Sequence, residues 1–323
     1  MKKNLISVLL PVYNAERFVA ETLDSLIRQT NKNFEIIAVN DGSSDGSLKV
    51  LREYAKRDDR IKVIDQKNQG LVKTLNTAAK LSSGEFLARI DADDVALDRR
   101  FEFQLKAMKE DSNRVLIAGG FDVMNEDGEI LYHDAVPTNY EDIINAMYTR
   151  NPIAHGSILM RRSAFEEAGG YSEDCGPTED YELWTRLSKI GTIIALPQTI
   201  FRWRVNPNGI TSTKSDIMEK HMKVNFVKFQ ELHPFKLVTR AALKEKFTHY
   251  VSVDPLHGVA MKERILQDLV NLSFVLLKQG RISDAIRQLF IISSTGRTGL
   301  RLVRYRVVKA IKYHGNHLLS KTD

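Results

Sequence analysis

Three aspartates lie within four positions in the stretch RIDADDV, residues 89–95. They follow GEFLA, an apolar run typical of a buried strand. Carboxylates crowded in this way repel one another unless a cation or hydrogen-bond donors compensate their charge. A hard divalent ion, Mg²⁺ or Mn²⁺, takes oxygen ligands and commonly bridges one or two carboxylates to the phosphates of a substrate. The alternative is a helix N-terminus whose acidic residues the helix dipole stabilises.

The elements that must position these aspartates decide between the two interpretations. The apolar runs LISVLLPVY, FEIIAVN, IKVID and GEFLA alternate with segments of helical periodicity, the first at residues 19–27. Such alternation predicts a mostly parallel sheet with helices on both faces, which binds ligands outside the carboxyl ends of its strands. Because PVYN, NDGSSD and DADD each follow a strand, Asp41, Asp91 and Asp93 are expected at one edge of the sheet. Their convergence favours the cation site.

Composition limits the class of protein. The chain has 323 residues, 43% of them hydrophobic, with charges of both signs along its length, which is typical of a soluble globular protein of about two domains. No apolar run approaches the roughly 18–20 residues of a membrane span, and the N-terminus lacks the cleavage site of a secretory signal. The single cysteine, Cys175, excludes an internal disulfide and a multi-cysteine metal site. We therefore expect a cytoplasmic protein.

Charge and turn residues predict a domain boundary. Residues 216–323 hold 19 basic and 9 acidic residues, a balance of +10, whereas the rest of the chain has 28 basic and 32 acidic ones. The stretch NPNGITSTKSD, residues 206–216, is rich in loop-forming residues. We expect an α/β domain at residues 1–215 and a basic helical region at 216–323. Within that region, apolar stripes from Ile265 to Leu276 and over Ile282, Ile286 and Leu289 predict a helical hairpin.

The last expected helix, within residues 297–323, is basic and amphipathic. Leucine, valine and isoleucine line one face, and five arginine and lysine residues surround the other. Two interpretations stay open: a helix resting on an anionic membrane surface, which would make the protein peripheral on the cytoplasmic face, or a helix packed on its own domain. Nucleic acid is not an expected partner, because only Tyr305 and Tyr313 are available to stack on bases. No oligomeric state follows from the sequence.

Several linked motifs carry a resemblance to a known family. VLLPVYNAERFVAETLDSLIRQT, VNDGSSDGS, GEFLARIDADDVALDRR and TEDYELWTRL occur in this order within residues 4–213. In order and spacing they resemble the family 2 glycosyltransferases, which use nucleotide sugars and have the GT-A fold, a Rossmann-like sheet flanked by helices. The resemblance implies Mn²⁺ or Mg²⁺ as cofactor and a nucleotide-sugar donor, with UDP-sugars favoured.

The resemblance implies a donor site at the strand ends. Asp41 would accept a hydrogen bond from the nucleotide base, Asp91 would lie near the ribose or the sugar, and Asp93 would hold the metal that bridges the diphosphate. Many relatives have an Arg-Asn pair and a later histidine near the metal; this chain offers Lys73 and Arg204 instead as diphosphate contacts. The residues expected to bind the nucleotide sugar are Pro11, Val12, Tyr13, Asp41, Lys73, Asp91, Ala92 and Arg204.

The same resemblance assigns the catalytic residues. Asp180 in EDYELW would be the general base, with Glu179 beside it; the alternative is that both are simply acids in the first turn of a helix. A carboxylate opposite the leaving group can deprotonate an acceptor hydroxyl as it attacks, and a single displacement inverts the anomeric configuration. The acceptor would be a saccharide or a lipid-linked molecule. His155 and Trp184 are assigned to its side, with a structural histidine an equal alternative.

Two other classes of protein were weighed. A nucleotidyltransferase that forms nucleotide sugars would be expected to have a glycine-rich phosphate loop after its first strand, and PVYNAERF contains no glycine. A non-catalytic binding protein would tolerate the loss of the base or metal carboxylate, and both are present. Gln198 and Arg202 are one residue too far apart for the QxxRW motif of processive synthases. We therefore expect a non-processive enzyme, in cell-surface polysaccharide or glycoconjugate synthesis.

Overall fold

The computed structural model describes residues 2–134, 136–207, 209–233, 255–278 and 281–293 and the single positions 295, 298, 302 and 303. The chain divides into two compact units. The first consists of Met1–Tyr140 and Asn151–Leu232, and the second of Glu141–Arg150 and His233–Asp323.

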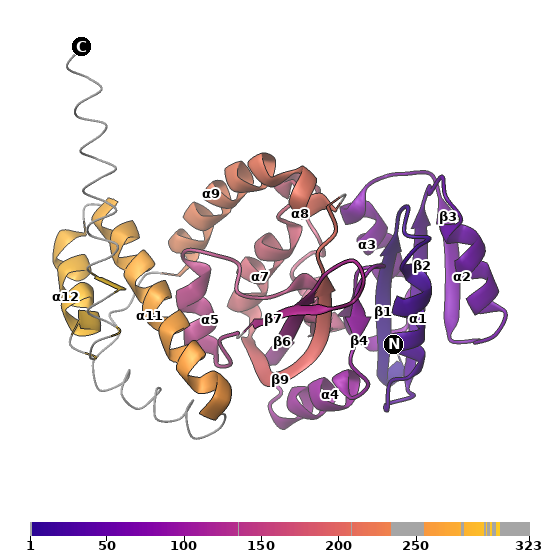
Figure 1. The fold of residues 1–323 in the computed structure, drawn as a ribbon, viewed down its shortest axis with the longest axis horizontal. Helices are drawn as coiled ribbons and strands as arrows, with labels where there is room; N and C mark the ends of the chain where they lie inside the picture. Colours follow the sequence, from indigo (N-terminus) through magenta and orange to yellow (C-terminus); the bar gives the residue numbers. More distant parts are fainter. Residues whose placement is uncertain are drawn as a thin grey trace, which may run out of the picture. The chain divides into compact units, whose positions relative to one another are not determined.

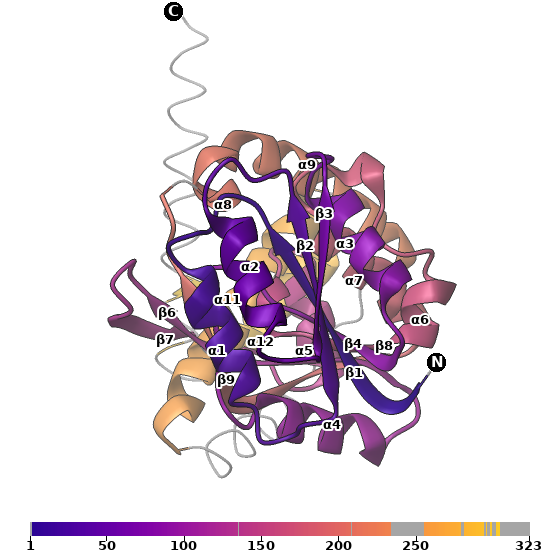
Figure 2. The same cartoon turned by 90° about the vertical axis from the view of Figure 1, so that its right-hand side faces the viewer.

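Alternating strands and helices build the first half of the first unit, as predicted. They are β1 (Lys2–Val12), α1 (Val19–Ile27), β2 (Phe34–Asp41), α2 (Ser47–Ala55), β3 (Ile61–Gln66), α3 (Leu71–Leu81) and β4 (Gly84–Arg89). The strands are parallel in the order β3-β2-β1-β4. Helices α1 and α2 cover one face of the sheet and α3 the other (Figures 1 and 2). Because both faces are covered, all residues of β2 are buried, which explains its continuous apolar sequence.

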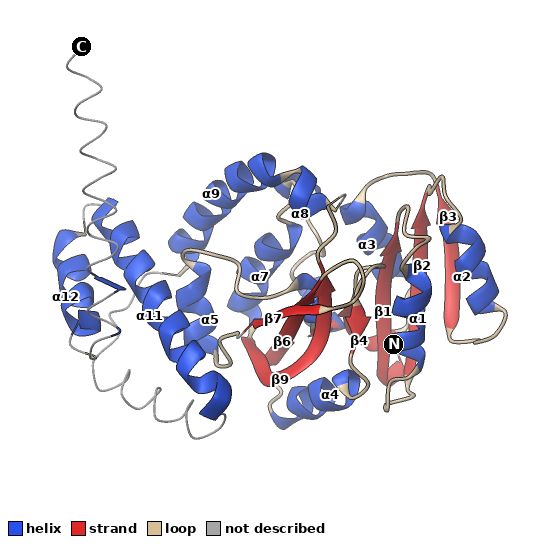
Figure 3. Ribbon diagram, viewed as in Figure 1, coloured by secondary structure: helices blue, strands red, loops and turns tan. Residues whose placement is uncertain are grey.

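Strands in parallel and antiparallel pairings extend the sheet in the second half of this unit. The additional strands are β5 (Val95–Ala96), β6 (Arg114–Met124), β7 (Ile130–Asp134), β8 (Leu159–Arg161) and β9 (Thr192–Arg204), and the sheet continues β4-β8-β6-β9-β5 with β7 paired to β6. The helices are α4 (Arg100–Glu110), α6 (Arg162–Glu167), α7 (Glu179–Ile190), α8 (Ile210–Thr213) and α9 (Ser215–Leu232). Figure 3 shows the strands at the centre of this unit with helices around them.

The core of the first unit lies between the sheet and α1 and α4. Val8 and Leu10 of β1 and Leu23 of α1 are completely buried in it. The rings of Phe34 and Phe101 pack with their centroids 5.7 Å apart. Each such side chain contributes roughly 1.5–3 kcal/mol when it is removed from water, so this core fixes the strand ends that face the ligand.

The division of the chain corrects the predicted boundary at residues 206–216. Helix α9 belongs to the first unit because it packs on α7: the ring of Tyr181 meets those of Phe226 and Phe229 at 5.3 and 6.1 Å. The loop before α9 is therefore a connection inside the unit, which ends at Leu232. Loop composition alone did not show that the aromatic residues of α9 have partners in α7.

The second unit contains the predicted helical hairpin. Helices α11 (Pro255–Lys278) and α12 (Ile282–Ser293) pack on each other. Arg150, also of this unit, donates two hydrogen bonds of 2.8 Å to the carboxylate of Asp268 in α11. Ile286 was expected in the second apolar stripe, but it is 59% exposed. Ile265, Leu269, Leu272 and Leu276 of α11 are buried, as predicted. The other buried residues of the pair include Leu266 and Val270 in α11 and Ala285, Gln288 and Ile292 in α12.

The predicted basic helix at 297–323 lies outside the described residues, apart from positions 298, 302 and 303. Among the helices that the structure describes, none has the length and apolar character to cross a membrane.

The buried Glu35 of β2 binds residues of β1 and β3 and the residue before β4. Glu35 Oε1 accepts hydrogen bonds from Ser7 Oγ (2.7 Å) and from the backbone N of Ser83 (2.6 Å), and Oε2 accepts one from Lys62 Nζ (2.7 Å). Burial raises the pKa of Glu35, but the hydrogen bonds from Lys62, Ser7 and Ser83 outweigh it and lower the pKa to about 2. The ionised carboxylate therefore stabilises the folded state.

We expect Glu35→Gln to lower the free energy of unfolding at pH 7 by about 1–3 kcal/mol. Since the pKa is near 2 in the folded state and about 4.3 in the unfolded one, the stabilisation is fully present above that unfolded value and disappears as the pH falls toward 2. Urea unfolding of both proteins at several pH values measures this. The exposed Glu53→Gln is the control. A difference in stability that stayed constant down to pH 3 would contradict the prediction.

Candidate active site

The loops after β1, β2 and β4 meet at the carboxyl edge of the sheet, as predicted. Val12 lies opposite Asn40, and Leu9 lies opposite Arg89. Pro11 and Val12 have buried side chains within β1, whereas Tyr13 directly after it is 56% exposed. Tyr13 therefore presents an exposed ring that a ligand can contact.

Asp41 is held by the turn that leads into α3. Its Oδ1 accepts hydrogen bonds from Gln66 Nε2 and Gln69 N, both at 2.8 Å, and Oδ2 accepts one from Gly70 N at 2.9 Å. Gly70 has φ +87°, a conformation that favours glycine. Because a carboxylate offers about four acceptor positions, Oδ2 can take one more donor. Sequence analysis missed the two glutamines, which belong to no recognised motif.

A buried arginine binds Asp91. Both Nη atoms of Arg89, the last residue of β4, donate to the two carboxylate oxygens of Asp91. The side chain of Arg89 is 3% exposed and that of Asp91 36%. Within the described part of the chain, Arg89 Nε has no hydrogen-bond partner. Sequence analysis did not single out Arg89, although it stands directly before the acidic loop.

The remaining acids of the loop are incompletely compensated. Asp93 Oδ2 accepts a hydrogen bond from Asn206 Nδ2 at 3.0 Å, and burial together with the negative charge of Asp91 raises the pKa of Asp93. Asp94 is completely buried. Its Oδ1 accepts from Arg204 N at 2.9 Å, and its Oδ2 has no partner among the described residues. Burial and the charges of Asp91 and Asp93 raise the pKa of Asp94 well above its usual range.

The carboxylate oxygens of the acidic loop fit a divalent cation that takes its other ligands from a bound substrate. Carboxylate oxygens are the ligands that Mg²⁺ and Mn²⁺ prefer, and a cation would relieve the negative charge around Asp93. Among the residues that the structure describes, no three Asp, Glu, His or Cys side chains form a ready-made metal site. A cation beside Asp93 would therefore take further oxygen ligands from the phosphates of a donor.

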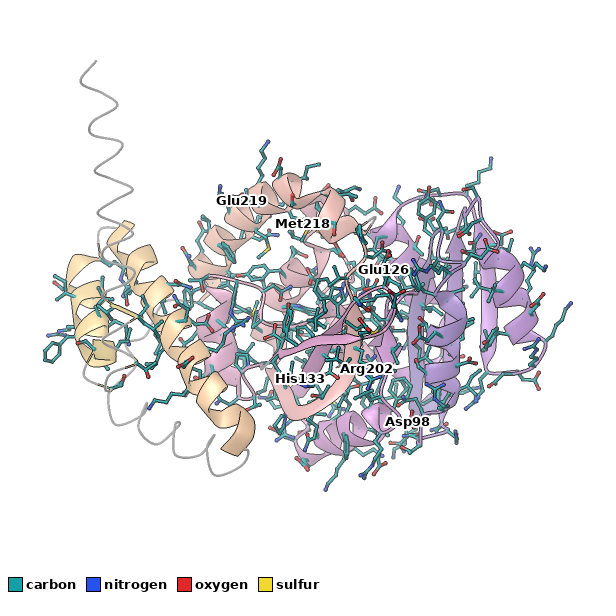
Figure 4. The ribbon with its side chains drawn as sticks, in the orientation of Figure 1. Asp98, Glu126, His133, Arg202, Met218 and Glu219 are labelled. Carbon is teal, nitrogen blue, oxygen red and sulfur yellow. The ribbon has the colours of Figure 1, made fainter. Side chains whose placement is uncertain are left out.

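The contacts of Arg204 correct the role expected for it. The side chain is 2% exposed, and its Nε donates to Asp93 O at 2.8 Å. Nη1 donates to the carbonyls of Asn125 (3.3 Å) and Glu126 (2.8 Å), and Nη2 donates to Glu21 Oε2 (2.5 Å). Arg204 thus fastens the acidic loop to α1 and to the turn between β6 and β7, in which Figure 4 labels Glu126. With these partners it is not available to a diphosphate.

Two other predicted donor contacts differ in what they can offer. Lys73, in the first turn of α3, is about half exposed, and its Nζ lies 3.5 Å from Glu173 Oε2. An exposed pair of this kind is weak, so Lys73 can turn to a phosphate, and its role stays a prediction. Ala92 is buried, and its carbonyl accepts a hydrogen bond from Thr22 Oγ1 at 2.9 Å; it shapes the acidic loop.

Asp180 and Glu179 begin α7. Asp180 Oδ2 accepts a hydrogen bond from Asn151 Nδ2 at 2.6 Å, and Oδ1 accepts one from Tyr181 N at 2.7 Å. Burial, assisted by the charge of Glu179, raises the pKa of Asp180. The helix dipole alone would lower it, so the environment makes this carboxylate a stronger base than an ordinary first-turn aspartate. Asp180 is partly exposed, whereas Glu179 is only 6% exposed.

His155 packs against α7, the helix that contains Trp184. His155 Nε2 is 2.8 Å from the hydroxyl oxygen of Tyr171, and Nδ1 is 3.6 Å from Glu179 Oε1. Burial and the positive charge of Arg89 lower the pKa of His155 to about 3, so the ring is neutral at pH 7. Trp184 is completely buried and packs edge-on against His155 at 5.7 Å. The expected acceptor contact of Trp184 is therefore wrong, and the contacts of His155 favour its structural interpretation.

Helix α9 holds the segment that leads into Asp180. Thr178 Oγ1 donates to Cys175 O at 2.7 Å and accepts from Asn225 Nδ2 of α9 at 2.9 Å. The ring of His221, also in α9, lies against Gly176, where an added Cβ would meet it at 2.7 Å. These contacts join two segments distant in sequence, and neither Asn225 nor Asn151 belongs to a motif that would have revealed it.

Comparisons with known proteins agree with this geometry. Residues 7–169, half of the chain, match the sequence model of "Glycosyl transferase family 2". An uncharacterized glycosyltransferase of Haemophilus influenzae is 27% identical over 295 residues, which are 87% of this chain and 89% of that protein. The putative glycosyltransferase EpsE of Bacillus subtilis is 35% identical over 190 residues, 58% of this chain and 67% of EpsE.

A solved structure shows the same fold. Residues 1–349 of TarS from S. aureus, in complex with UDP-GlcNAc, superpose with a TM-score of 0.55 and 18% identity, covering 90% of this chain and 91% of that one. This likeness supports the GT-A arrangement of sheet and helices. With the family match and the acidic strand ends in place, the chain belongs to the family 2 glycosyltransferases.

Proposed function

We propose that this enzyme transfers a glycosyl unit from a nucleoside diphosphate sugar to a hydroxyl of a saccharide or lipid-linked acceptor, one unit at a time and with inversion at the anomeric carbon. The observation that carries the proposal is the pairing of an acidic loop with a strengthened base. The segment between the two regions supports this pairing, because an added Cβ at Gly156 would lie 3.1 Å from Asp94 Oδ2, and Nδ1 of the neighbouring His155 is 3.6 Å from Glu179 Oε1. UDP is the favoured nucleotide, and the UDP-GlcNAc and UDP complexes of TarS support it.

On the acceptor side, Asp180 would remove the proton of the attacking hydroxyl. Asn151 orients Asp180 Oδ2 by a hydrogen bond of 2.6 Å. The raised pKa of Asp180 makes its carboxylate a better acceptor for the proton. General-base assistance of this kind typically contributes about 10² to 10⁴ in rate. Attack from the side opposite the leaving group gives inversion in a single displacement.

On the donor side, Tyr13 and Asp41 would bind the base, and Asp91 would accept hydrogen bonds from hydroxyls of the ribose or the sugar. Asp93 would hold Mn²⁺ or Mg²⁺, which as a Lewis acid stabilises the charge of the leaving diphosphate. Lys73 is the side chain most accessible for an additional phosphate contact. A cytoplasmic setting and a place in cell-surface polysaccharide or glycoconjugate synthesis stay predictions from the family resemblance.

Binding and product analysis test this proposal. UDP-, GDP- and dTDP-sugars are screened by thermal shift with Mn²⁺, since a ligand at 100 times its Kd stabilises the folded state by about 2.7 kcal/mol. NMR of the product then reads the anomeric configuration. Retention of configuration would contradict the single displacement. Release of pyrophosphate from a nucleoside triphosphate and a sugar phosphate would instead identify a nucleotidyltransferase.

A further inference from the structure

We propose that Arg89 determines which aspartate of the acidic loop holds the cation. By neutralising Asp91, it commits that carboxylate to hydrogen bonds with donor hydroxyls and leaves Asp93 as the cation ligand. The binding of donor hydroxyls by Asp91 rests on the proposed function. The binding of the cation by Asp93 is a property of the free protein and is tested separately.

The first step is the geometry of the ion pair. Both Nη atoms of Arg89 donate to both oxygens of Asp91. A guanidinium stays protonated in proteins, and its fork matches a carboxylate in one orientation, so Asp91 is fixed in position and permanently compensated. Each of its oxygens keeps one acceptor position, and 36% of the side chain is exposed. Asp91 can therefore accept neutral donors from a ligand.

The second step is that Arg89 cannot move away. Its side chain is 3% exposed, its backbone N donates to Ile158 O at 3.4 Å, and its carbonyl accepts from Arg100 Nη2 at 2.9 Å. Buried Nε has no partner among the described residues. A purely structural ion pair would be expected to satisfy all its donors, because a buried unpaired donor is costly. Among the described residues, the hydrogen bonds of this guanidinium go to Asp91.

The third step separates the two aspartates electrostatically. A divalent cation at Asp91 would be repelled by the fixed positive charge of Arg89, whereas a hydroxyl group would not. Asp93 has a neutral partner, the amide of Asn206, at 3.0 Å. The loop thus contains one carboxylate with a cationic partner, Asp91, and two with neutral partners, Asp93 and Asp94. Because Asp94 is completely buried, the approaching cation is directed to Asp93.

The test measures Mn²⁺ binding to the free protein by electron paramagnetic resonance. The double variant Arg89→Gln/Asp91→Asn replaces the ion pair by a neutral amide pair, so the local charge is unchanged. We expect its Kd for Mn²⁺ to stay within threefold of the wild-type value, whereas Asp93→Asn weakens binding at least tenfold. Arg89→Gln alone leaves Asp91 uncompensated and is expected to tighten Mn²⁺ binding at least threefold.

The opposite results would overturn the proposal. A double variant that lost tenfold in Mn²⁺ affinity would make Asp91 a cation ligand, and an Arg89→Gln protein without tighter binding would show that Arg89 does not direct the cation. Thermal unfolding confirms that each variant is folded. Should Arg89→Gln alone not fold, Asp91→Asn, which leaves the charge of Arg89 uncompensated, is expected to bind Mn²⁺ more weakly than the double variant. Equal affinities of these two variants would then overturn the role of Arg89.

A second readout tests the hydroxyl contacts. With saturating Mn²⁺, the double variant is expected to bind UDP-N-acetylglucosamine, the probe, about tenfold more weakly in calorimetry; unchanged affinity would remove Asp91 from donor recognition. If the wild-type protein bound no nucleotide sugar, the proposed function would fail. The Mn²⁺ titrations would still decide the role of Arg89.

Discussion

Asp180→Asn is expected to lower turnover by about 10²-fold or more while the donor Kd changes by no more than a few-fold. Asparagine keeps the shape of the side chain, and its oxygen can still accept the hydrogen bond that Asn151 donates. It cannot take a proton. Single-turnover transfer with saturating donor measures the chemical step, and calorimetry measures donor binding, so the two effects are separated.

Glu179→Gln is the matched control. Glu179 is 6% exposed and faces His155 Nδ1 at 3.6 Å, so its loss is expected to reduce turnover much less. An inactive Glu179 variant beside an active Asp180 variant would exchange the two roles. Full activity in both would place the base elsewhere, and neutral His155 would be the next candidate.

The pH dependence follows from the same assignment. Turnover requires ionised Asp180, whose pKa is raised by burial above that of an ordinary aspartate, about 3.9. As the pH falls through this raised pKa, the base is protonated and the rate declines. The acidic limb of the rate profile is therefore expected at higher pH than an exposed aspartate would give, and Asp180→Asn should remove it.

Sequence predicted the strand ends because local patterns determine them. Residues 71–81 have helical periodicity and form α3 over that range, and the apolar strands β1, β2 and β4 end where their polar loops begin. In a parallel sheet these ends share one edge, so the position of Asp41 and Asp91 at that edge could be predicted without knowledge of their contacts.

The sequence did not predict which partners the buried charged side chains bind. Arg204 is near the acidic loop as expected, but its guanidinium finds carbonyl oxygens of Asn125 and Glu126, which no pattern in β9 reveals. Arg89 directly precedes the acidic loop in the sequence, yet its pairing with Asp91 depends on other elements that bury the arginine side chain. A charged residue can be located from local sequence, whereas its partner is chosen by tertiary packing.

In the Asp93→Ala variant, binding of the nucleotide-sugar donor is expected no longer to depend on a divalent ion. The rate of transfer is expected to fall by about 10²- to 10³-fold, the range that several kcal/mol of lost charge stabilisation implies. Asp93 has Asn206 as a neutral partner and a pKa raised by burial and by the charge of Asp91. Its removal would therefore eliminate a carboxylate at which the surrounding negative charge favours a cation.

The matched control is Asp98→Asn, close in sequence but outside the acidic loop. Its side chain is 61% exposed and lies 3.6 Å from Arg28 Nε, and Figure 4 labels it near α4. We expect this variant to keep wild-type transfer and Mn²⁺ dependence. Donor affinity is measured with Mn²⁺ and with EDTA for all three proteins. Transfer at the full rate by the EDTA-treated wild-type enzyme would show that Asp93 has no metal role, because a reaction that proceeds without the cation cannot depend on the residue that binds it.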